Sequence, residues 1–416
     1  MAASLPKQVP IPKNGTDYRG KVVLAPMVRS GELPSRLLAL KYGADLVWGP
    51  ETIDRSMIGT TRSINPSTGT VDFTRPSSNV LRDPSLRETG NARDSVIYRL
   101  HPELEKGRLI FQIGTSSPTL AVQAAKLVAA DVAGIDVNAG CPKPFSTSGG
   151  MGAALLKTPD TLCDILTALV EEVGTQFEIG ISVKIRLLST PEETEALVSR
   201  LVKTGITALT IHCRTTPMRP RERAIREQLK MIVRVCHEAG VACVMNGDVY
   251  SRGEALQLMD EYGADGAMIA TAAEKNPSVF RSEADGGLAY WKEIMREYTT
   301  FALQVENRWG NTKFLLAQHI PGKSEEAKKM VTCKGYGDSV RALGLEGMDD
   351  RAKEVDERLA IDTTKVSKAT KRARAREGEG NGGGHKKPKR KQQDEERKEV
   401  VQESSLQTAA PAALAV

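Results

Sequence analysis

The sequence of 416 residues lacks long apolar runs, clustered cysteines and metal-ligand spacings. No run of about 18 apolar residues occurs, so we expect no transmembrane helix. The first 20 residues are polar and contain three prolines, which argues against a secretory signal. The six cysteines are too scattered for a disulfide framework, and none stands in a CxxC or Cys/His pattern typical of zinc. These absences predict an intracellular protein without a structural metal site.

Positive charge is concentrated near the C-terminal end. The chain has 58 Lys plus Arg against 52 Asp plus Glu, a formal net charge of +6. Residues 365–416 hold 13 basic and 7 acidic residues, so this segment alone has the net charge of the whole chain. It has too few aliphatic residues to offset the entropy of folding, and we expect a disordered basic tail.

Two basic clusters stand in this tail. Residues 385–391, His-Lys-Lys-Pro-Lys-Arg-Lys, have the form of a nuclear-localisation signal, and residues 371–376 form a second cluster. Either cluster could contact phosphates. We expect the protein in the cytoplasm, the nucleus or both.

Eight short apolar runs alternate with amphipathic stretches. The runs are nearly continuous, as strands buried on both faces require. The expected strands are 22–27, 46–50, 108–114, 134–140, 180–186, 208–214, 242–248 and 266–271. The clearest expected helices are 119–130, 159–173, 192–203, 221–239 and 252–262. Eight strands with intervening helices predict an α/β fold of the (β/α)8 TIM-barrel type, because a doubly wound sheet usually has fewer strands and often an early glycine-rich fingerprint.

The chain divides into four predicted parts. They are an N-terminal extension at 1–20, the barrel at 21–285, a small all-helical domain at 286–347, and a linker and tail at 348–416. Within the barrel, residues 51–107 form a long loop rich in polar residues and proline, and such loops are usually functional or partly structured. Apolar residues recur at helical spacing between 290 and 318.

Polar residues end the otherwise apolar strands. The chemistry of a TIM barrel lies at the C-terminal ends of its strands. A buried polar group without a partner costs about 1–3 kcal/mol, so packing alone does not explain these residues. The strand-end positions, most of them polar, are Pro26, Met27, Glu51, Gln112, Asn138, Cys141, Lys184, Arg186, His212, Arg214, Asn246, Gly247, Asp248, Ala270 and Thr271.

The sharpest motif is Asp-Val-Asn-Ala-Gly-Cys-Pro-Lys at 136–143, followed by Ser-Gly-Gly-Met-Gly at 148–152. It resembles the Asn-x-Gly-Cys-Pro loop of the tRNA-dihydrouridine synthases, flavoenzymes that reduce a uracil in tRNA. Further motifs agree in order and spacing at 24–29, 36–45, 70–73, 111–115, 184–186, 212–214 and 245–248. The resemblance covers roughly residues 22–347 and is greatest to the eukaryotic branch that modifies position 20 of the D-loop.

The resemblance implies a bound FMN, with NADPH or NADH as reductant and the helical domain as a tRNA-binding part. The residues that would hold FMN are Pro26, Met27, Val28, Gln112, Lys184, His212, Asn246, Gly247, Asp248, Ala270 and Thr271. Lys184 would place positive charge near the N1/O2 edge, where the reduced ring is negative. Main-chain N–H groups after the last two strands suit a phosphate. The family commonly has Arg where Thr271 stands, so any guanidinium contact there is lost.

Cys141 is the catalytic residue that the resemblance implies. Hydride from flavin N5 would add to uracil C6, and a thiol above C5 would supply the proton, which an ordinary thiol with a pKa near 8.5 still carries at neutral pH. Asn138, Lys143 and Arg214 would contact the substrate, whose base must be flipped out of the RNA. Glu51 either orients a ligand or caps the next turn.

Other residues have simpler interpretations, and two other functions stay open. We expect Cys163, Cys213, Cys236, Cys243 and Cys333 to pack in the core, and His101, His237 and His319 to be surface or satisfied histidines. The alternative functions are another FMN barrel reductase acting on a small molecule and a non-catalytic RNA-binding barrel. The sequence leaves the oligomeric state open.

Overall fold

The structure is a computed structural model that describes residues 8–77, 82 and 94–361. The predicted basic tail with its nuclear-localisation signal lies outside the described residues. Of the predicted N-terminal extension, residues 8–20 are described. They pack on the barrel, where the ring of Tyr18 is buried 5.9 Å from that of Trp48.

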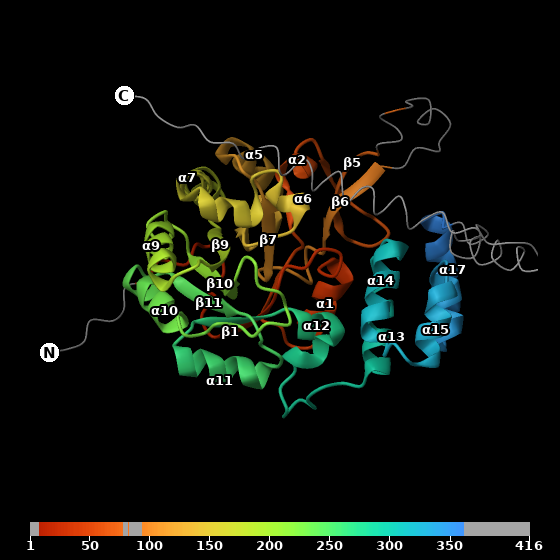
Figure 1. The fold of residues 1–416 in the computed structure, drawn as a ribbon. Helices are drawn as coiled ribbons and strands as arrows, with labels where there is room; N and C mark the ends of the chain where they lie inside the picture. Colours follow the sequence, from red (N-terminus) through yellow and green to blue (C-terminus); the bar gives the residue numbers. More distant parts are fainter. Residues whose placement is uncertain (1–7, 78–81, 83–93, 362–416) are drawn as a thin grey trace, which may run out of the picture. The chain divides into compact units, whose positions relative to one another are not determined.

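Eight parallel strands close into the predicted barrel (Figure 1). β1 pairs with β2 on one side and β12 on the other, and β2 pairs with β7 to complete the ring. Each strand overlaps one predicted strand. The strands are β1 (Lys21–Leu24), β2 (Leu46–Trp48), β7 (Leu109–Gly114), β8 (Gly134–Ala139), β9 (Gly180–Leu187), β10 (Ala208–Thr215), β11 (Ala242–Asn246) and β12 (Gly266–Ile269).

Helices cover the outside of the barrel. They are α1 (Leu33–Lys41), α5 (Pro118–Val128), α7 (Pro159–Leu169), α9 (Pro191–Leu201), α10 (Leu229–Glu238), α11 (Arg252–Tyr262) and α12 (Thr271–Lys275), with the short α6 (Pro144–Thr147) and α8 (Thr175–Phe177) between them. α9 shows why such segments become helical. Thr190 and Glu193 form a capping box at its start, and Leu197, Val198 and Leu201 are buried on one side.

The predicted start of α10 at residue 221 is wrong, because the helix begins only at Leu229. Arginine side chains hold the preceding residues in a loop. Arg214 Nε donates to the Glu222 carbonyl at 2.7 Å, and Arg226 Nη2 donates to the Asp248 carbonyl at 2.6 Å. These contacts compete with the helix that the local sequence favours.

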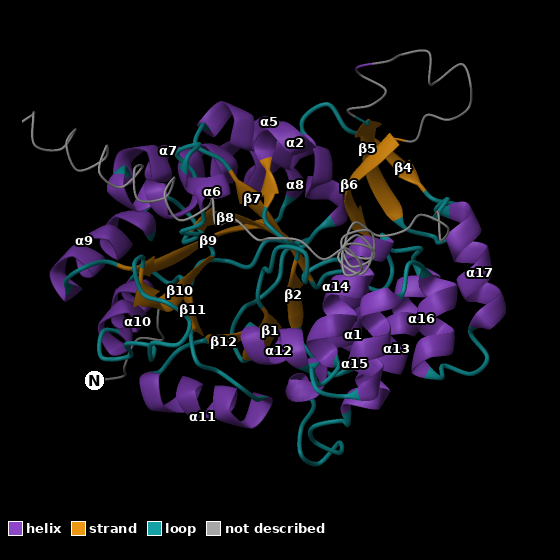
Figure 2. Cartoon of the chain, turned by 45° about the vertical axis from the view of Figure 1, so that its right-hand side comes forward, coloured by secondary structure: helices purple, strands orange, loops and turns teal. Residues whose placement is uncertain are grey.

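The predicted long loop at 51–107 is largely folded where it is described. It contains β3 (Thr52–Ile53), α2 (Asp54–Met57), β4 (Thr61–Ile64), β5 (Val71–Pro76) and β6 (Asp94–Leu100). β4, β5 and β6 form a separate antiparallel sheet (Figure 2). Its apolar residues join the barrel core, where the Tyr98 ring lies 6.5 Å from that of Phe73 and 4.9 Å from that of Phe111.

A second core belongs to the C-terminal helices α13 (Trp291–Gln304), α14 (Trp309–His319), α15 (Glu325–Thr332), α16 (Tyr336–Leu343) and α17 (Asp349–Arg358). The helical pattern predicted across 290–318 is interrupted between α13 and α14, where Glu306 has φ +48°. The helical region also extends past its predicted end at 347, because Ala352 and Val355 of α17 are fully buried in this core. Residues 349–358 are therefore not a linker.

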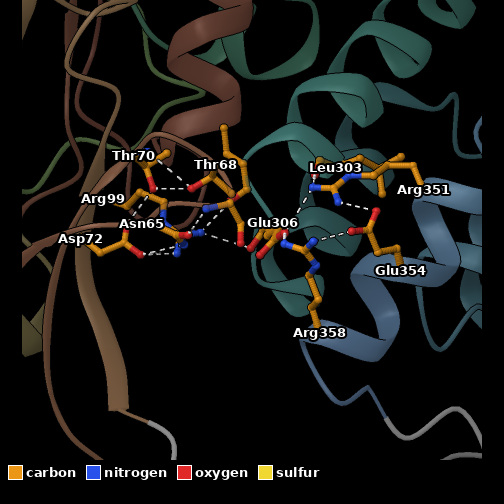
Figure 3. A network of polar contacts seen from close by, with 12 residues as sticks. Asn65, Thr68, Thr70, Asp72, Arg99, Leu303, Glu306, Arg351, Glu354 and Arg358 are labelled. Atoms are coloured by element: carbon orange, nitrogen blue, oxygen red, sulfur yellow. Dashed lines mark hydrogen bonds and ion pairs between the residues drawn. The ribbon is translucent and has the colours of Figure 1, made fainter.

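A polar network joins the antiparallel sheet to the C-terminal helices (Figure 3). The Arg99 guanidinium donates to both carboxylate oxygens of Asp72 and to the Val305 carbonyl at 2.6 Å. The Glu306 carboxylate accepts from Arg351 at 3.2 Å and from Arg358 at 2.9 Å. The network fixes the turn between α13 and α14 against β5 and β6.

We predict that Arg99→Leu destabilises the protein by about 3–5 kcal/mol, because the buried Asp72 carboxylate loses its cation. Equilibrium denaturation of the full chain measures this loss. Arg234→Leu is the control, since its ion pairs with Glu195 and Glu238 are exposed and worth little. Equal loss of stability in both variants would contradict a special role for the network.

Candidate active site

Five polar residues lie on the same face of five adjacent strands, near the C-terminal end of each strand. They are Gln112 on β7, Asn138 on β8, Lys184 on β9, His212 on β10 and Asn246 on β11. The strand register places Asn138 beside Lys184, and His212 beside Asn246. The structure therefore brings these predicted site residues together at the C-terminal end of the barrel, where TIM-barrel chemistry takes place.

A buried carboxyl group supports this cluster from below. Asp136 accepts hydrogen bonds from Gln112 Nε2 at 2.8 Å and from Ser182 Oγ at 2.7 Å. Burial raises the pKa of Asp136. Asn246 is held in a similar way, because its Nδ2 donates to the Met268 carbonyl at 2.9 Å. Gln112 and Asn246 are therefore fixed by hydrogen bonds within the protein.

The Cys141 loop is held by Asn138. Its Oδ1 accepts from the N–H groups of Gly140 and Cys141, both at 3.0 Å. The Cys141 carbonyl accepts from Ala153 N at 2.9 Å. A Cβ on Gly152, which has φ +58°, would lie 2.6 Å from this carbonyl, so the glycine allows the loop to close. Asn138, predicted to contact the substrate, therefore also shapes the Cys141 loop.

The surroundings of Cys141 favour its thiol form. Burial raises the pKa of Cys141, and the nearby Glu51 carboxylate raises it further. The Lys143 N–H and the charges of Arg186 and Lys143 oppose this shift without cancelling it. A thiol with a raised pKa keeps its proton at neutral pH, as a proton donor requires.

Sequence reasoning placed Arg186 only in a basic patch at the barrel mouth and left Glu51 ambiguous. Arg186 Nε donates to the Gly140 carbonyl at 2.7 Å, directly before Cys141, and Nη1 donates to the Thr215 carbonyl at 3.2 Å. Glu51 accepts from Ser146 Oγ at 3.0 Å on the other side of the loop. Only the position of both residues at strand ends pointed to them beforehand.

Lys184 is a half-buried cation without a hydrogen-bond partner in the described part of the chain, and the nearby Asp136 carboxylate is the side chain whose charge favours it. No residue in the described ranges forms a hydrogen bond or ion pair with its Nζ. Burial and the charge of Arg186 lower the pKa of Lys184 to about 8, so the ammonium is still largely protonated at pH 7. Such a group is costly unless a ligand supplies negative charge. Lys184 therefore suits an anionic ligand.

His212 is neutral at physiological pH. Burial, together with the positive charges of Lys184, Arg186 and Arg214, lowers the pKa of His212 to about 2. Its imidazole can donate one hydrogen bond and accept another, but it contributes no charge.

Arg214 is held by the fold, and its predicted contact with the substrate stays a prediction. The side chain is 5% exposed, forms an ion pair with Asp248 and donates to the Pro220 carbonyl at 3.2 Å. Although burial opposes it, the bonds from Arg214 and from the Ala224 N–H lower the pKa of Asp248. Both side chains are used to hold the loop after β10, so only the main chain of Asp248 remains for a ligand.

The ends of β11 and β12 offer main-chain donors. Gly247 has φ +119°, and a Cβ there would lie 3.3 Å from the His212 ring. Thr271 begins α12, directly after Ala270, and the first N–H groups of a helix have no partner within it. These N–H groups suit a phosphate, even though Thr271 offers no guanidinium at the position where the family commonly has Arg.

The remaining predicted residues differ in their exposure. Pro26 and Met27 are half-buried beyond β1, next to the end of β12. Val28 is 51% exposed and Lys143 is exposed, so neither is fixed in the site. In the described part of the chain, no three His, Cys, Asp or Glu residues are grouped to hold a metal, and no helix is long and apolar enough to span a membrane.

Fold and site together define a TIM-barrel protein with a thiol that keeps its proton beside a lysine suited to an anionic ligand. Comparison with known proteins identifies its family. The family described as Dihydrouridine synthase (Dus) matches residues 23–313. The chain belongs to the dihydrouridine synthase family, as its motifs predicted.

Individual relatives agree with this assignment. The chain is 49% identical over 335 residues to "tRNA-dihydrouridine(20) synthase [NAD(P)+]" of Schizosaccharomyces pombe, an alignment of 79% of this chain and 66% of that protein. It is 46% identical to the protein of the same name from Saccharomyces cerevisiae, over 76% of this chain and 81% of the relative. The "tRNA-dihydrouridine(20a/20b) synthase [NAD(P)+]" of Saccharomyces cerevisiae is 26% identical, over 77% of this chain and 78% of the relative. The chain spans just under two thirds of the Schizosaccharomyces pombe protein.

Proposed function

We propose that this protein is an FMN-dependent tRNA-dihydrouridine synthase. It reduces the C5–C6 bond of the uridine at position 20 of the tRNA D-loop, with NADPH or NADH as reductant. Identities of 49% and 46% to relatives named for position 20, against 26% to one named for positions 20a and 20b, support this choice of uridine.

The observation that carries the proposal is the pairing of Cys141 and Lys184. A half-buried thiol that keeps its proton lies at the same barrel end as the Lys184 ammonium, which has no hydrogen-bond partner among the described residues. A reduction that leaves negative charge on a uracil needs the first group, and an anionic reduced flavin needs the second.

The residues fit FMN. Lys184 Nζ would lie at the N1/O2 edge of the ring, and Gln112 and Asn138 at its polar margin. The N–H groups at Gly247, Asp248 and Thr271 would hold the phosphate. When bound, FMN supplies the hydride that adds to uracil C6.

The protein's own residues complete the reaction. Cys141 gives its proton to C5 as negative charge develops there, and Arg186 and Asn138 hold the loop so that the thiol stays in place. The neutral His212 hydrogen-bonds without adding charge. The target base must leave its stack to reach Cys141, and the barrel mouth and C-terminal helices would hold the surrounding tRNA.

Purified protein tests the proposal directly. We expect a yellow protein that releases FMN and converts one uridine per unmodified tRNA to dihydrouridine with NADPH, detected by nucleoside mass spectrometry. Free uracil, uridine and orotate are the small-molecule controls. Reduction of a free pyrimidine in preference to tRNA would favour the small-molecule reductase, and a colourless inactive protein would favour the RNA-binding barrel.

The basic residues beyond the described part would strengthen tRNA binding. Truncation after Asp362 removes an excess of positive charge, so we expect weaker tRNA affinity and a flatter plot of log affinity against log salt. Each lost phosphate contact should reduce that slope by about 1, while turnover at saturating tRNA stays the same.

Deletion of residues 404–416, which contain no charged side chain, is the matched control. Equal slopes for the full chain and the truncation after Asp362 would mean that the basic segment contacts no phosphate. Nuclear import would then be its proposed purpose, and the distribution of the protein between nucleus and cytoplasm would test it.

A further inference from the structure

Glu51 occupies a place built for a carboxyl group beside the Cys141 loop. It lies just past the end of β2, and its Oε1 accepts a hydrogen bond from Ser146 Oγ at 3.0 Å. A Cβ at Gly114 of β7 would lie 2.5 Å from the same oxygen, so this strand leaves room for the side chain by having no Cβ there. The Cys141 loop and two strands thus enclose the carboxyl.

The carboxyl of Glu51 has no counter-charge. In the described residues no Lys, Arg or His forms an ion pair with it, and its Oε2 is buried without a well-placed hydrogen-bond donor. The side chains that interact with it besides Ser146 are Asn138 and Cys141. Burial raises the pKa of Glu51, so the group holds a proton more readily than an exposed glutamate.

We propose that Glu51 returns a proton to Cys141 after each turnover. The inference rests on the proposed function, in which the Cys141 thiol protonates C5 and becomes a thiolate. The O–H bond of the Glu51 carboxyl then breaks, the S–H bond of Cys141 forms again, and the carboxylate takes its next proton from water. No electrons are exchanged in this step.

The charges around the pair support this direction of transfer. Glu51 faces the thiol from β2, Arg186 and Lys184 from β9, and Lys143 from the thiol's own loop. Arg186 donates to two main-chain carbonyls, and Lys143 is exposed. A thiolate beside a carboxylate is a pair of like charges, so such a pair keeps one proton strongly.

Rapid-quench kinetics with excess tRNA and NADPH test the step through Glu51→Gln. We expect a first turnover at the rate of the wild-type protein, because Cys141 begins with its proton. Later turnovers should be slower by about tenfold or more, since the loss of a proton-transfer group typically costs 10²–10⁴-fold. Flavin reduction by NADPH, followed by absorbance, should stay unchanged.

Two outcomes would overturn the proposal. A first turnover slowed as much as the later ones would mean that Glu51 only shapes the site, and unchanged later turnovers would mean that it has no part in the reaction. Ser146→Ala is the matched variant, because it removes the hydrogen bond to Glu51 and keeps the carboxyl. It should behave as the wild type, and a burst like that of Glu51→Gln would assign the effect to the hydrogen bond.

A second measurement needs no enzymatic activity. The rate of Cys141 alkylation by iodoacetamide is followed against pH by peptide mass spectrometry. Burial raises the pKa of Cys141 and the Glu51 charge adds to this shift, so the midpoint in Glu51→Gln should move to lower pH. Cys163 on α7, also half-buried, is the internal control and should not change.

The two measurements separate the inference from the function on which it rests. If wild-type protein forms no dihydrouridine, the proposed function fails, and the proton return fails with it even if the alkylation midpoint moves. If the wild type is active and the midpoint of Cys141 does not move in Glu51→Gln, the two groups are not coupled and only the proposal for Glu51 falls.

Discussion

Cys141→Ala is expected to lower the rate of dihydrouridine formation by about 10²–10⁴-fold, the usual contribution of a general acid. Its flavin content and its oxidation of NADPH should be nearly normal, because the thiol acts only when uracil C5 is protonated. Flavin reduction and dihydrouridine yield, measured on the same preparation, separate the two half-reactions. Cys163→Ala is the control, and it should retain full yield.

A near-normal yield in Cys141→Ala would remove this residue from the mechanism.

The pH profile of the wild-type protein gives a further check on the protonated form of Cys141. Because burial and the Glu51 charge raise the pKa of Cys141, the thiol stays protonated to a higher pH than an ordinary cysteine. Single-turnover rates should therefore hold above pH 8.5 and fall only at higher pH. A fall that begins below pH 8 would contradict a protonated donor with a raised pKa.

Lys184→Met should weaken FMN binding by roughly 10–100-fold, because a hydrogen bond to a charged group is worth about 1.5–3 kcal/mol. Flavin reduction should slow as well, since the anionic reduced ring loses its compensating charge. Equilibrium dialysis of the flavin and stopped-flow absorbance measure the two effects. Lys143→Met, which removes an exposed lysine near the site, is the control.

Lys184→Met should also stabilise the protein when no FMN is bound. The folded-state pKa of Lys184 is lowered to about 8, against about 10.4 in an unfolded chain, so protonated Lys184 opposes folding at neutral pH. Wild-type stability should rise with pH between these values, and the advantage of Lys184→Met should shrink over the same window. Full flavin content and a normal rate of flavin reduction in Lys184→Met would remove Lys184 from the flavin site.

The barrel could be predicted because each of its strands has a recognisable apolar pattern in the local sequence. Runs such as Gly134–Ala139 and Ala242–Asn246 are mostly apolar without alternation, a pattern typical of strands buried on both faces, and both are buried along their whole length. Most of the site could be predicted as well, because a polar residue ends most of these runs and is visible in the local sequence. Both features depend on neighbours in the sequence.

Features that depend on distant partners could not be predicted. β5 and β6 pair across an interval longer than either strand, and α17 is mostly charged with only Ala352 and Val355 buried. Arg214 was predicted as a substrate contact from its position at a strand end. Its partners, Asp248 and the Pro220 carbonyl, are brought to it by the fold and could not be read from the sequence. The carboxyl of Glu51 likewise meets the Cys141 loop only through the packing of β2 and β7.

The central claim is that this protein reduces one uridine of tRNA, at position 20, through Cys141. The most direct measurement is a map of dihydrouridine in tRNA from cells that lack this protein, repeated after return of the wild-type gene or Cys141→Ala. We predict that dihydrouridine disappears at position 20 and persists at positions 20a, 20b, 16 and 17, and that only the wild type restores it. Unchanged dihydrouridine at position 20 in the cells without the protein would contradict the account.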